Sequence, residues 1–427
     1  MLQRGFALLG QSVPGHIGLE DELSRRVRYL WRTFCLLASL IAIPAAFTFA
    51  QQTLPSSGAS AVESHAVGGE PENTSGGSST EKQLHLAEQQ GRADAALLDW
   101  TLENSGALKG DLRTGELRIA FTVTAAEGWW DKAAGNQLAW HDAPEDSFHL
   151  RIFVLDQVDG RFVPGLALHV TLIDANGNEQ SAPADFGWYP LINAYGGNVL
   201  LDNDSSYTIR VTVEPLLQHH VFAPGVRFER ATTAEFPPVR IAQNLLPQLP
   251  LASALAAANE AALLKPCNAA LSAAITALWQ QSVSGAEKSS GDYFVGYALD
   301  YSGLSMPIAG SKVHLKSLVD FSGRDDVRLD LLPRDSRTGR LIPGLKPQVS
   351  LLAPDGKSYG PGELPLAWNQ WLNHYGRTSR IPRKGVYKLR VHINAPGFRR
   401  WGRPSERFAS PVDVEFDEVS LQPGKKD

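Results

Sequence analysis

The chain has 427 residues, of which 43% are hydrophobic and 20% charged, a composition typical of globular domains rather than of a disordered chain. Its formal net charge of −5 gives no electrostatic argument for a nucleic-acid partner. The two cysteines, Cys35 and Cys267, are too few for a disulfide framework, so hydrophobic cores have to hold the domains together.

The N-terminal part has the pattern of a membrane anchor. Residues 1–28 are polar and end in arginines, which predicts a cytoplasmic segment, and residues 29–50 are mostly apolar and just long enough for a transmembrane helix. The arginine flank orients that end to the cytoplasm, so we expect a single-pass inner-membrane protein with its bulk in the periplasm. A cleaved signal peptide ending at Thr48-Phe-Ala50, or a twin-arginine signal at Arg25-Arg26, is the alternative.

The next segments differ in composition. Residues 51–92 are rich in Ser, Gly, Glu and Gln, which predicts a flexible linker. Residues 93–245 contain alternating or β-branched runs, such as 148–155 and 207–213, separated by turn signals such as Asn176-Gly177. Many short strands without a helical pattern between them predict a first antiparallel β-sandwich.

Residues 246–284 predict a helical connector. Leu251–Leu264 is rich in alanine and leucine, and Pro266 opens a second run, which together indicate a helical hairpin. We expect its apolar face to pack on a sandwich, and the alternative, a helix lying on a membrane, has almost no cationic residues to support it. Residues 285–421 repeat the strand pattern and predict a second sandwich, followed by a polar tail, 422–427.

The two predicted sandwiches share a motif. Residues 188–196 and 368–376 carry Trp, Asn, Tyr and Gly at the same offsets. A Pro-Gly-Leu triplet precedes each copy and a Tyr-x-x-Arg-Val strand follows each. The matched spacings indicate an internal duplication with a period of about 180 residues, far above that of solenoid repeats, so each copy should be a whole domain.

The sequence carries no motif of the common enzyme classes, and we expect a protein that is not an enzyme. Histidines are the best remaining candidates for chemistry because imidazole is the commonest protein metal ligand. His149 lies in a predicted strand and the pair His219-His220 follows a later one, so these residues could converge at one end of the first sandwich. The alternative is an exposed loop pair and a strand histidine satisfied by hydrogen bonds.

Tryptophan is abundant, and two uses for it stay open. Trp129-Trp130 and Trp140 lie in the first predicted sandwich, and Trp188 and Trp368 occupy equivalent places of the duplication. Exposed aromatic side chains stack on sugar rings, whereas the recurrence of Trp188 and Trp368 favours packing in a core.

Around the Tyr-Gly repeat the chain resembles the periplasmic high-affinity iron-uptake proteins, which are copper-binding immunoglobulin-like sandwiches that work beside an iron permease. The resemblance covers most of both domains. It is carried by Phe148-His149, Val163-Pro-Gly-Leu166, Ala194-Tyr-Gly and Tyr207 to Pro215 in the first copy, and by Ile342-Pro-Gly-Leu345 and Asn373-His374-Tyr-Gly376 in the second. It implies an all-β fold of two divergent, tandem immunoglobulin-like sandwiches, joined by the helical hairpin behind an N-terminal transmembrane helix.

The resemblance also implies copper or iron as the metal and an iron permease or another membrane protein as the partner. The family binds metal through a methionine, histidines and a glutamate, so the candidate ligands are His149, His219, His220 and His374. Arg151 stands where the glutamate belongs, Ala194 where the Tyr-Gly histidine belongs, and Arg328 is the counterpart of His149 in the second copy. Neither copy has the full set, and an arginine there would repel a cation.

A composite site that uses His149 and His374 is one route to a metal centre across the duplication. Two functions therefore stay open. The first is an accessory protein of iron or copper uptake. The second is a non-catalytic interaction module that has lost the metal site and binds a protein or glycan partner.

Overall fold

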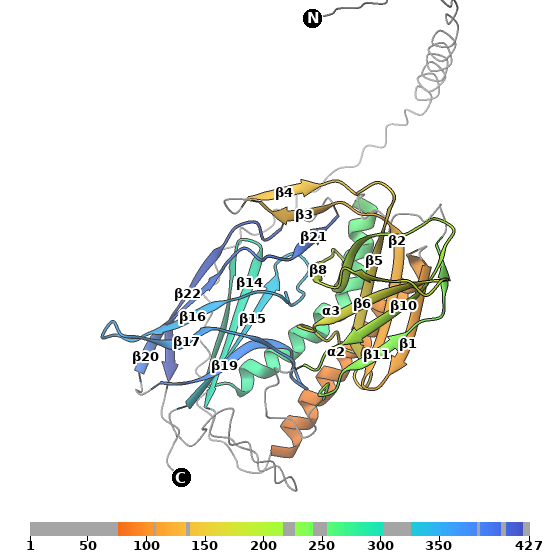
Figure 1. Cartoon of the computed structure of the whole chain (residues 1–427). Helices are drawn as coiled ribbons and strands as arrows, with labels where there is room; N and C mark the ends of the chain where they lie inside the picture. Colours follow the sequence, from red (N-terminus) through yellow and green to blue (C-terminus); the bar gives the residue numbers. More distant parts are fainter. Residues whose placement is uncertain are drawn as a thin grey trace, which may run out of the picture. The chain divides into compact units, whose positions relative to one another are not determined.

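The computed structural model describes residues 76–105, 108–133, 137–216, 227–241, 254–301, 326–381, 385–402 and 407–421 (Figure 1). The chain divides into two units, Met1–Val62 and Glu63–Asp427, and all described residues belong to the second. The predicted cytoplasmic segment, the predicted transmembrane segment, the tail 422–427, and His219 and His220 lie outside the described residues.

The described chain consists of two repeats, 76–241 and 254–421, and each begins with a helix. The helices are α2 (Gly76–Asn104) and α3 (Ala254–Gln281). The strands of the first repeat are β1 (Leu108–Thr114), β2 (Leu117–Ala125), β3 (Trp129–Lys132), β4 (Leu138–His141), β5 (Ser147–Asp156), β6 (Leu168–Asp174), β7 (Glu179–Ala182), β8 (Phe186–Trp188), β9 (Ala194–Leu200), β10 (Ser206–Val213), β11 (Thr232–Glu235) and β12 (Val239–Arg240). Those of the second are β13 (Ser284–Ser290), β14 (Tyr293–Tyr301), β15 (Asp326–Asp335), β16 (Gln348–Leu352), β17 (Ser358–Glu363), β18 (Leu366–Ala367), β19 (His374–Arg380), β20 (Gly385–Ile393), β21 (Arg399–Trp401) and β22 (Val412–Leu421).

Each repeat forms two antiparallel sheets around a core. In the first repeat the run β1-β2-β5-β9-β8 shares a core with β11-β10-β6-β7, and in the second β13-β14-β15-β19-β18 shares one with β17-β16-β20-β22. Burial alternates along β10, where Tyr207, Ile209, Val211 and Val213 point inward. This period of two is what a half-buried strand requires. The prediction of a mostly β, sandwich-type fold is confirmed.

The outer face of the first sandwich is covered as well. Along β5, Leu150, Ile152 and Val154 belong to the sandwich core, whereas Phe153 and Leu155 pack against α2 and its surroundings. Burial on both faces explains why all but the first residue of this strand is buried. It also means that His149 and Arg151, which share a face with Phe153 by strand periodicity, lie on the covered outer face.

The flexible-linker prediction is wrong for residues 76–92. These residues begin α2, and residues 93–104, assigned to the first sandwich, complete it. The helix is polar overall, but Leu97, Leu98 and Leu102 are buried. Tertiary packing of one apolar stripe stabilises a helix that composition alone does not indicate.

The helical-hairpin prediction is also wrong, because α3 is one continuous helix with Pro266 inside it. Leu264 and Leu271 on either side of the proline are buried, and this packing offsets the hydrogen bond that proline removes. The expected packing of the apolar face is observed, since α3 contributes to clusters with both repeats. Gln83 near the start of α2 donates to Gln281 at the end of α3 (2.7 Å), so the helices run in opposite directions.

Within the described part of the chain, Asn259–Gln281 of α3 is the one stretch long and apolar enough to cross a membrane. In the structure this stretch buries Leu264, Leu271 and Ile275. Leu271 and Ile275 pack with Leu332 of β15, and Leu264 packs with Trp401 and residues of the first repeat. This stretch therefore packs against both repeats in the structure.

The two repeats exchange structural elements. Strand β21 of the second repeat completes the sheet of the first, where it pairs in parallel with β8 and antiparallel with β3 (Figure 1). Trp188 of the first repeat belongs to the core of the second and meets Phe408 at 5.2 Å between ring centroids. Trp368 of the second repeat belongs to the core of the first and meets Phe228, also at 5.2 Å.

A buried arginine covers each exchanged tryptophan. The guanidinium of Arg340 lies 4.2 Å from the ring centroid of Trp188 and donates to the Tyr189 carbonyl at 2.7 Å. Its equivalent, Arg161, lies 5.9 Å from the ring centroid of Trp368 and donates to the Gln370 carbonyl at 2.9 Å. The duplication is therefore a structural pair in which each copy completes the other.

We expect the Trp368→Ala substitution, although it is in the second repeat, to destabilise the first. Loss of a buried tryptophan lowers the free energy of unfolding by about 3–5 kcal/mol. Hydrogen exchange should show the loss of protection in β6 and β10, whereas Trp188→Ala should show it in β16 and β20. Val158→Ala, at a side chain that is 79% exposed, is the control and should change stability by less than about 0.5 kcal/mol. Loss of protection confined to the second repeat in Trp368→Ala would contradict the exchange.

Candidate functional site

The first candidate site surrounds His149 near the start of β5. The amide of Asn198 is oriented by the backbone of Glu127, because its Oδ1 accepts from the Glu127 N–H at 3.1 Å and its Nδ2 donates to the Glu127 carbonyl at 2.7 Å. His149 Nδ1 lies 2.8 Å from the same Oδ1 and must therefore be the donor. His149 Nε2, at 3.0 Å from the Tyr189 hydroxyl, is left as the acceptor.

This histidine is a neutral, fully enclosed side chain. Its exposed fraction is 0%, and desolvation by burial lowers its pKa to about 4. Burial raises the pKa of the Tyr189 hydroxyl, which stays protonated and donates. Trp401, from the inserted strand β21, covers the imidazole at 4.3 Å between ring centroids. A metal ion at Nε2 would have to displace the Tyr189 hydroxyl.

The neighbouring position on the same face of β5 is filled by an ion pair. Arg151, whose side chain is 3% exposed, pairs with the Glu127 carboxylate, and its guanidinium lies 4.6 Å from the ring centroid of Tyr189. Burial opposes ionisation of Glu127, but the charge of Arg151 holds the pKa of that carboxyl below its ordinary value. The cluster therefore has an internal cation beside the histidine.

The second candidate site surrounds His374, the first residue of β19. Its Nδ1 donates to the Leu372 carbonyl at 2.8 Å, and its Nε2 lies 3.2 Å from Asp330 Oδ1. The other oxygen of Asp330 lies 3.1 Å from Arg328 Nε. Both His374 and Asp330 are buried.

The two sites hold the same three kinds of group at exchanged positions. In the gapless alignment of the repeats, Arg328 takes the place of His149 and Asp330 takes the place of Arg151. Each cluster contains one imidazole, one guanidinium and at least one carboxylate, and each pairs its own charges. Such a set needs no added cation to be electrostatically satisfied.

The sites do not assemble the predicted ligands into one centre. His149 belongs to a cluster of the first repeat and His374 to a cluster of the second, and among the described residues no group of three or more His, Cys, Asp or Glu side chains is placed to hold a metal ion. His219 and His220 lie outside the described residues, so their role stays a prediction. The residues present around His149 do not fit a metal centre.

Sequence reasoning missed most of the residues that close these sites. Glu127, Tyr189, Asn198 and Trp401 reach His149 from separate segments, and no local pattern in the sequence connects them. Asp330 had a signal, because the alignment of the repeats places it opposite Arg151.

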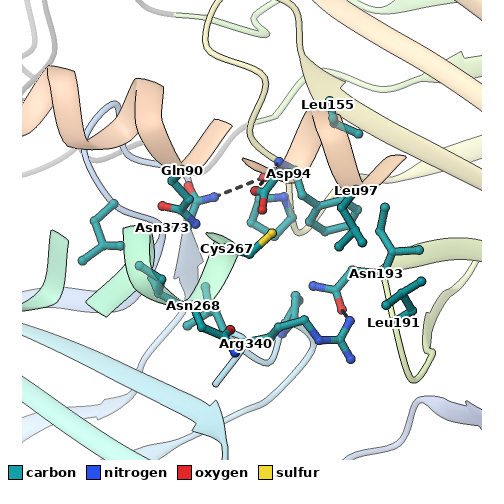
Figure 2. A pocket seen from close by; sticks show the side chains of 17 residues that line it. Gln90, Asp94, Leu97, Leu155, Leu191, Asn193, Cys267, Asn268, Arg340 and Asn373 are labelled. Atoms are coloured by element: carbon teal, nitrogen blue, oxygen red, sulfur yellow. Dashed lines mark hydrogen bonds between the residues drawn. The ribbon is translucent and has the colours of Figure 1, made fainter. Parts of the chain in front are cut away.

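A third feature, which the sequence did not indicate, is a cavity of about 70 Å³ between the helices and the two sandwiches (Figure 2). Much of its wall comes from equivalent residues of the two repeats: Phe162 and Leu341, Pro164 and Pro343, Ile192 and Leu372, Asn193 and Asn373. It therefore lies where the duplicated halves meet. We call it the junction cavity.

The polar groups of the junction cavity come from four side chains on the helices, from the pair Asn193 and Asn373, and from one arginine. Gln90 and Asp94 of α2 face Cys267 and Asn268 of α3, and Arg340 lies farther along the wall. Burial raises the pKa of Asp94 to about 6 and that of the Cys267 thiol well above its usual range, so the thiol is not a nucleophile at neutral pH. Burial lowers the pKa of Arg340 to about 10, which leaves it charged.

Comparison with known proteins gives no family. No protein-family model matches the chain, and no curated protein matches it. A copper-bound variant of FetP from uropathogenic Escherichia coli strain F11 is 15% identical, covers 31% of this chain and 93% of its own, and has a TM-score of 0.26.

Two further solved structures match at a similar level. FetP of the same strain, as isolated, is 20% identical over 32% of this chain and 95% of its own, with a TM-score of 0.25. A DUF4426 family protein from Pseudomonas aeruginosa PAO1 is 12% identical over 32% of this chain and 98% of its own, with a TM-score of 0.21. Likenesses at these identities and TM-scores are distant and assign neither a family nor a function.

We expect a neutral His149 to make the protein less stable in acid. The unfolded chain takes up a proton near the ordinary histidine pKa of 6.5, whereas the native state does so only near 4, so the native state loses about 3 kcal/mol relative to the unfolded state as the pH falls through this window. The measurement is the free energy of unfolding against pH for the wild type and for His149→Gln.

The difference in free energy of unfolding between the wild type and His149→Gln gives the contribution of the histidine alone. Asp94 and Asp156, whose pKa values are raised to about 6, titrate in the opposite sense and do so in both proteins. The wild type should lose the extra stability between pH 6.5 and 4, and the variant should not. Parallel curves would show that His149 is not held neutral.

Proposed function

We propose that this chain is a non-catalytic binding protein, held at the inner membrane by residues 29–50 with its two sandwiches in the periplasm, and that it engages a protein partner rather than a metal ion. The observation that carries the proposal is the pair of ion-paired clusters around His149 and His374. In both repeats a guanidinium occupies the face where the resemblance places metal ligands.

The energies involved favour a protein partner over a metal ion at His149. A cation about 4 Å from a guanidinium is repelled by about 4 kcal/mol per unit charge at the effective dielectric constant of a protein site. Relieving that repulsion at Arg151 means separating it from Glu127, which leaves a buried charge unpaired and costs about 3–5 kcal/mol. A metal ion at His149 would also displace the Tyr189 hydroxyl. Repulsion, loss of the ion pair and displacement of the hydroxyl all oppose metal binding.

The β3–β4 hairpin is the surface that best suits a protein partner. Strand β4 ends the large sheet of the first repeat, and Trp129, Trp130 and Trp140 on the hairpin are partly exposed. Trp130 and Trp140 lie 5.3 Å apart between ring centroids, and Trp129 stacks on His141 at 5.0 Å. Tryptophan is enriched at the energetic centres of protein interfaces.

One observation favours a second candidate, the handling of iron or copper in metal uptake. His374 Nε2 points at a carboxylate oxygen of Asp330, and imidazole with carboxylate is a donor pair that transition metals accept. Arg328 competes for the same carboxylate, so this candidate ranks below the first.

Metal titration separates the two candidates. We expect purified full-length chain to bind Cu(II) and Fe(II) no more tightly than a surface histidine does, because both candidate clusters are closed by their own charges. Isothermal titration and metal analysis of wild type, His149→Ala and His374→Ala should therefore agree. One-to-one tight binding that disappears in any single variant among His149→Ala, His374→Ala and His219→Ala would replace the proposal with the uptake function.

Partner binding is tested on the hairpin. We expect Trp130→Ala together with Trp140→Ala to abolish a stoichiometric cross-linked complex in membranes that express the full-length chain, because the substitutions remove two of the three partly exposed tryptophans of the hairpin. Val386→Ala, at an exposed residue of β20 in the second repeat, should leave the complex intact. A complex that survives the double substitution, in a variant with unchanged thermal stability, would exclude this surface.

A further inference from the structure

The geometry points to the junction cavity as a binding site for a small primary ammonium compound, with Asp94 of α2 as the counter-ion. This inference is independent of the proposed function, because it involves neither the β3–β4 hairpin nor the clusters around His149 and His374.

The cavity presents acceptors that lack donors. Among the described residues, neither Gln90 Oε1 nor Asn268 Oδ1 has a hydrogen-bond donor, although both atoms are buried. An unsatisfied buried acceptor costs about 1–3 kcal/mol, so two of them around one cavity call for a donor inside it. The carboxylate of Asp94 is a third acceptor on the same wall.

A primary ammonium group matches this set. It carries three N–H donors and one positive charge, which suits two amide oxygens and one carboxylate. The donors that reach the Asp94 carboxylate are weak ones, the Phe162 N–H at 3.4 Å from Oδ2 and the thiol of Cys267. The pKa of Asp94 is raised because the effect of burying the carboxylate outweighs the effect of the donors and of Arg161.

The groups around Asp94 do not cancel its charge. Arg161 and Asp159 of the loop after β5 act on it in opposite senses, and Cys267 of α3 faces it as a neutral thiol. Arg340 lies farther along the wall, where its Nη2 donates to the carbonyls of Tyr189 and Pro190. The acidic end of the cavity is therefore the end that selects a cation.

Size and lining limit the ligand. The cavity volume of about 70 Å³ holds a few water molecules or one small organic ion. Leu97 and Leu271 belong to the apolar part of the wall, which suits a short alkyl group rather than a hydrated metal ion. Ethylammonium is a suitable probe, with ethanol as its neutral counterpart and acetate as its anionic one.

The experiment is a ligand-observed NMR titration of full-length chain with each probe. We expect saturable binding of ethylammonium in the millimolar range, and neither ethanol nor acetate should compete. Because the Asp94 pKa is raised to about 6, the affinity for ethylammonium should fall about tenfold from pH 8 to pH 5. Ethylammonium binding should also raise the melting temperature.

Matched variants identify the site. Asp94→Asn should weaken ethylammonium binding at pH 8 by at least about tenfold, because it removes the counter-ion. Glu88→Gln makes the same change of charge at an exposed residue of α2 and should leave binding within twofold. Gln90→Leu keeps the charge, removes one acceptor and should weaken binding by a smaller factor, which preserves the test if Asp94→Asn does not fold.

Three outcomes would overturn the inference. Binding that is unchanged in both Asp94→Asn and Gln90→Leu would place the ligand elsewhere. Competition by ethanol or acetate would show that the cavity does not select an ammonium group. The absence of saturable binding at high millimolar ethylammonium would mean that the acceptors are satisfied by water. The metal and cross-linking experiments are unaffected by any of these results.

Discussion

The structure depends on the reciprocal burial of two equivalent tryptophans. Trp188 lies in the core of the second repeat and Trp368 in the core of the first, and an arginine of the host repeat covers each ring. A sandwich folded alone would lack its largest core side chain and expose the one it donates. The duplicated halves are therefore one cooperative body rather than two independent domains on a linker.

The exchange also determines the chemistry of the site around His149. Strand β21 enters the sheet of the first repeat and places Trp401 over the imidazole. That cover removes water, which lowers the pKa of the histidine and strengthens the pairing of Arg151 with Glu127. The residues that could have held an ion are instead satisfied by each other.

The two copies differ at the helices that meet at the junction cavity. Gly91 packs against Gly160 in one half and Asn268 against Gly339 in the other, which identifies corresponding turns of α2 and α3. One turn later in α2 comes Asp94, a half-buried acid beside the thiol of Cys267. The junction cavity thus has an acidic end that an exact two-fold repeat could not produce.

The sequence by itself determined the duplication, the sandwich fold and the strand that carries His149, because these follow from local periodicity and spacing. It did not determine α2, whose polar composition indicated a linker, or the continuity of α3 through Pro266, because tertiary packing decides both. The contacts that close the site around His149, and the junction cavity, were likewise decided by tertiary structure. Glu127, Tyr189, Asn198 and Trp401 are distant in sequence, and only the folded chain brings their hydrogen bonds and rings to one histidine.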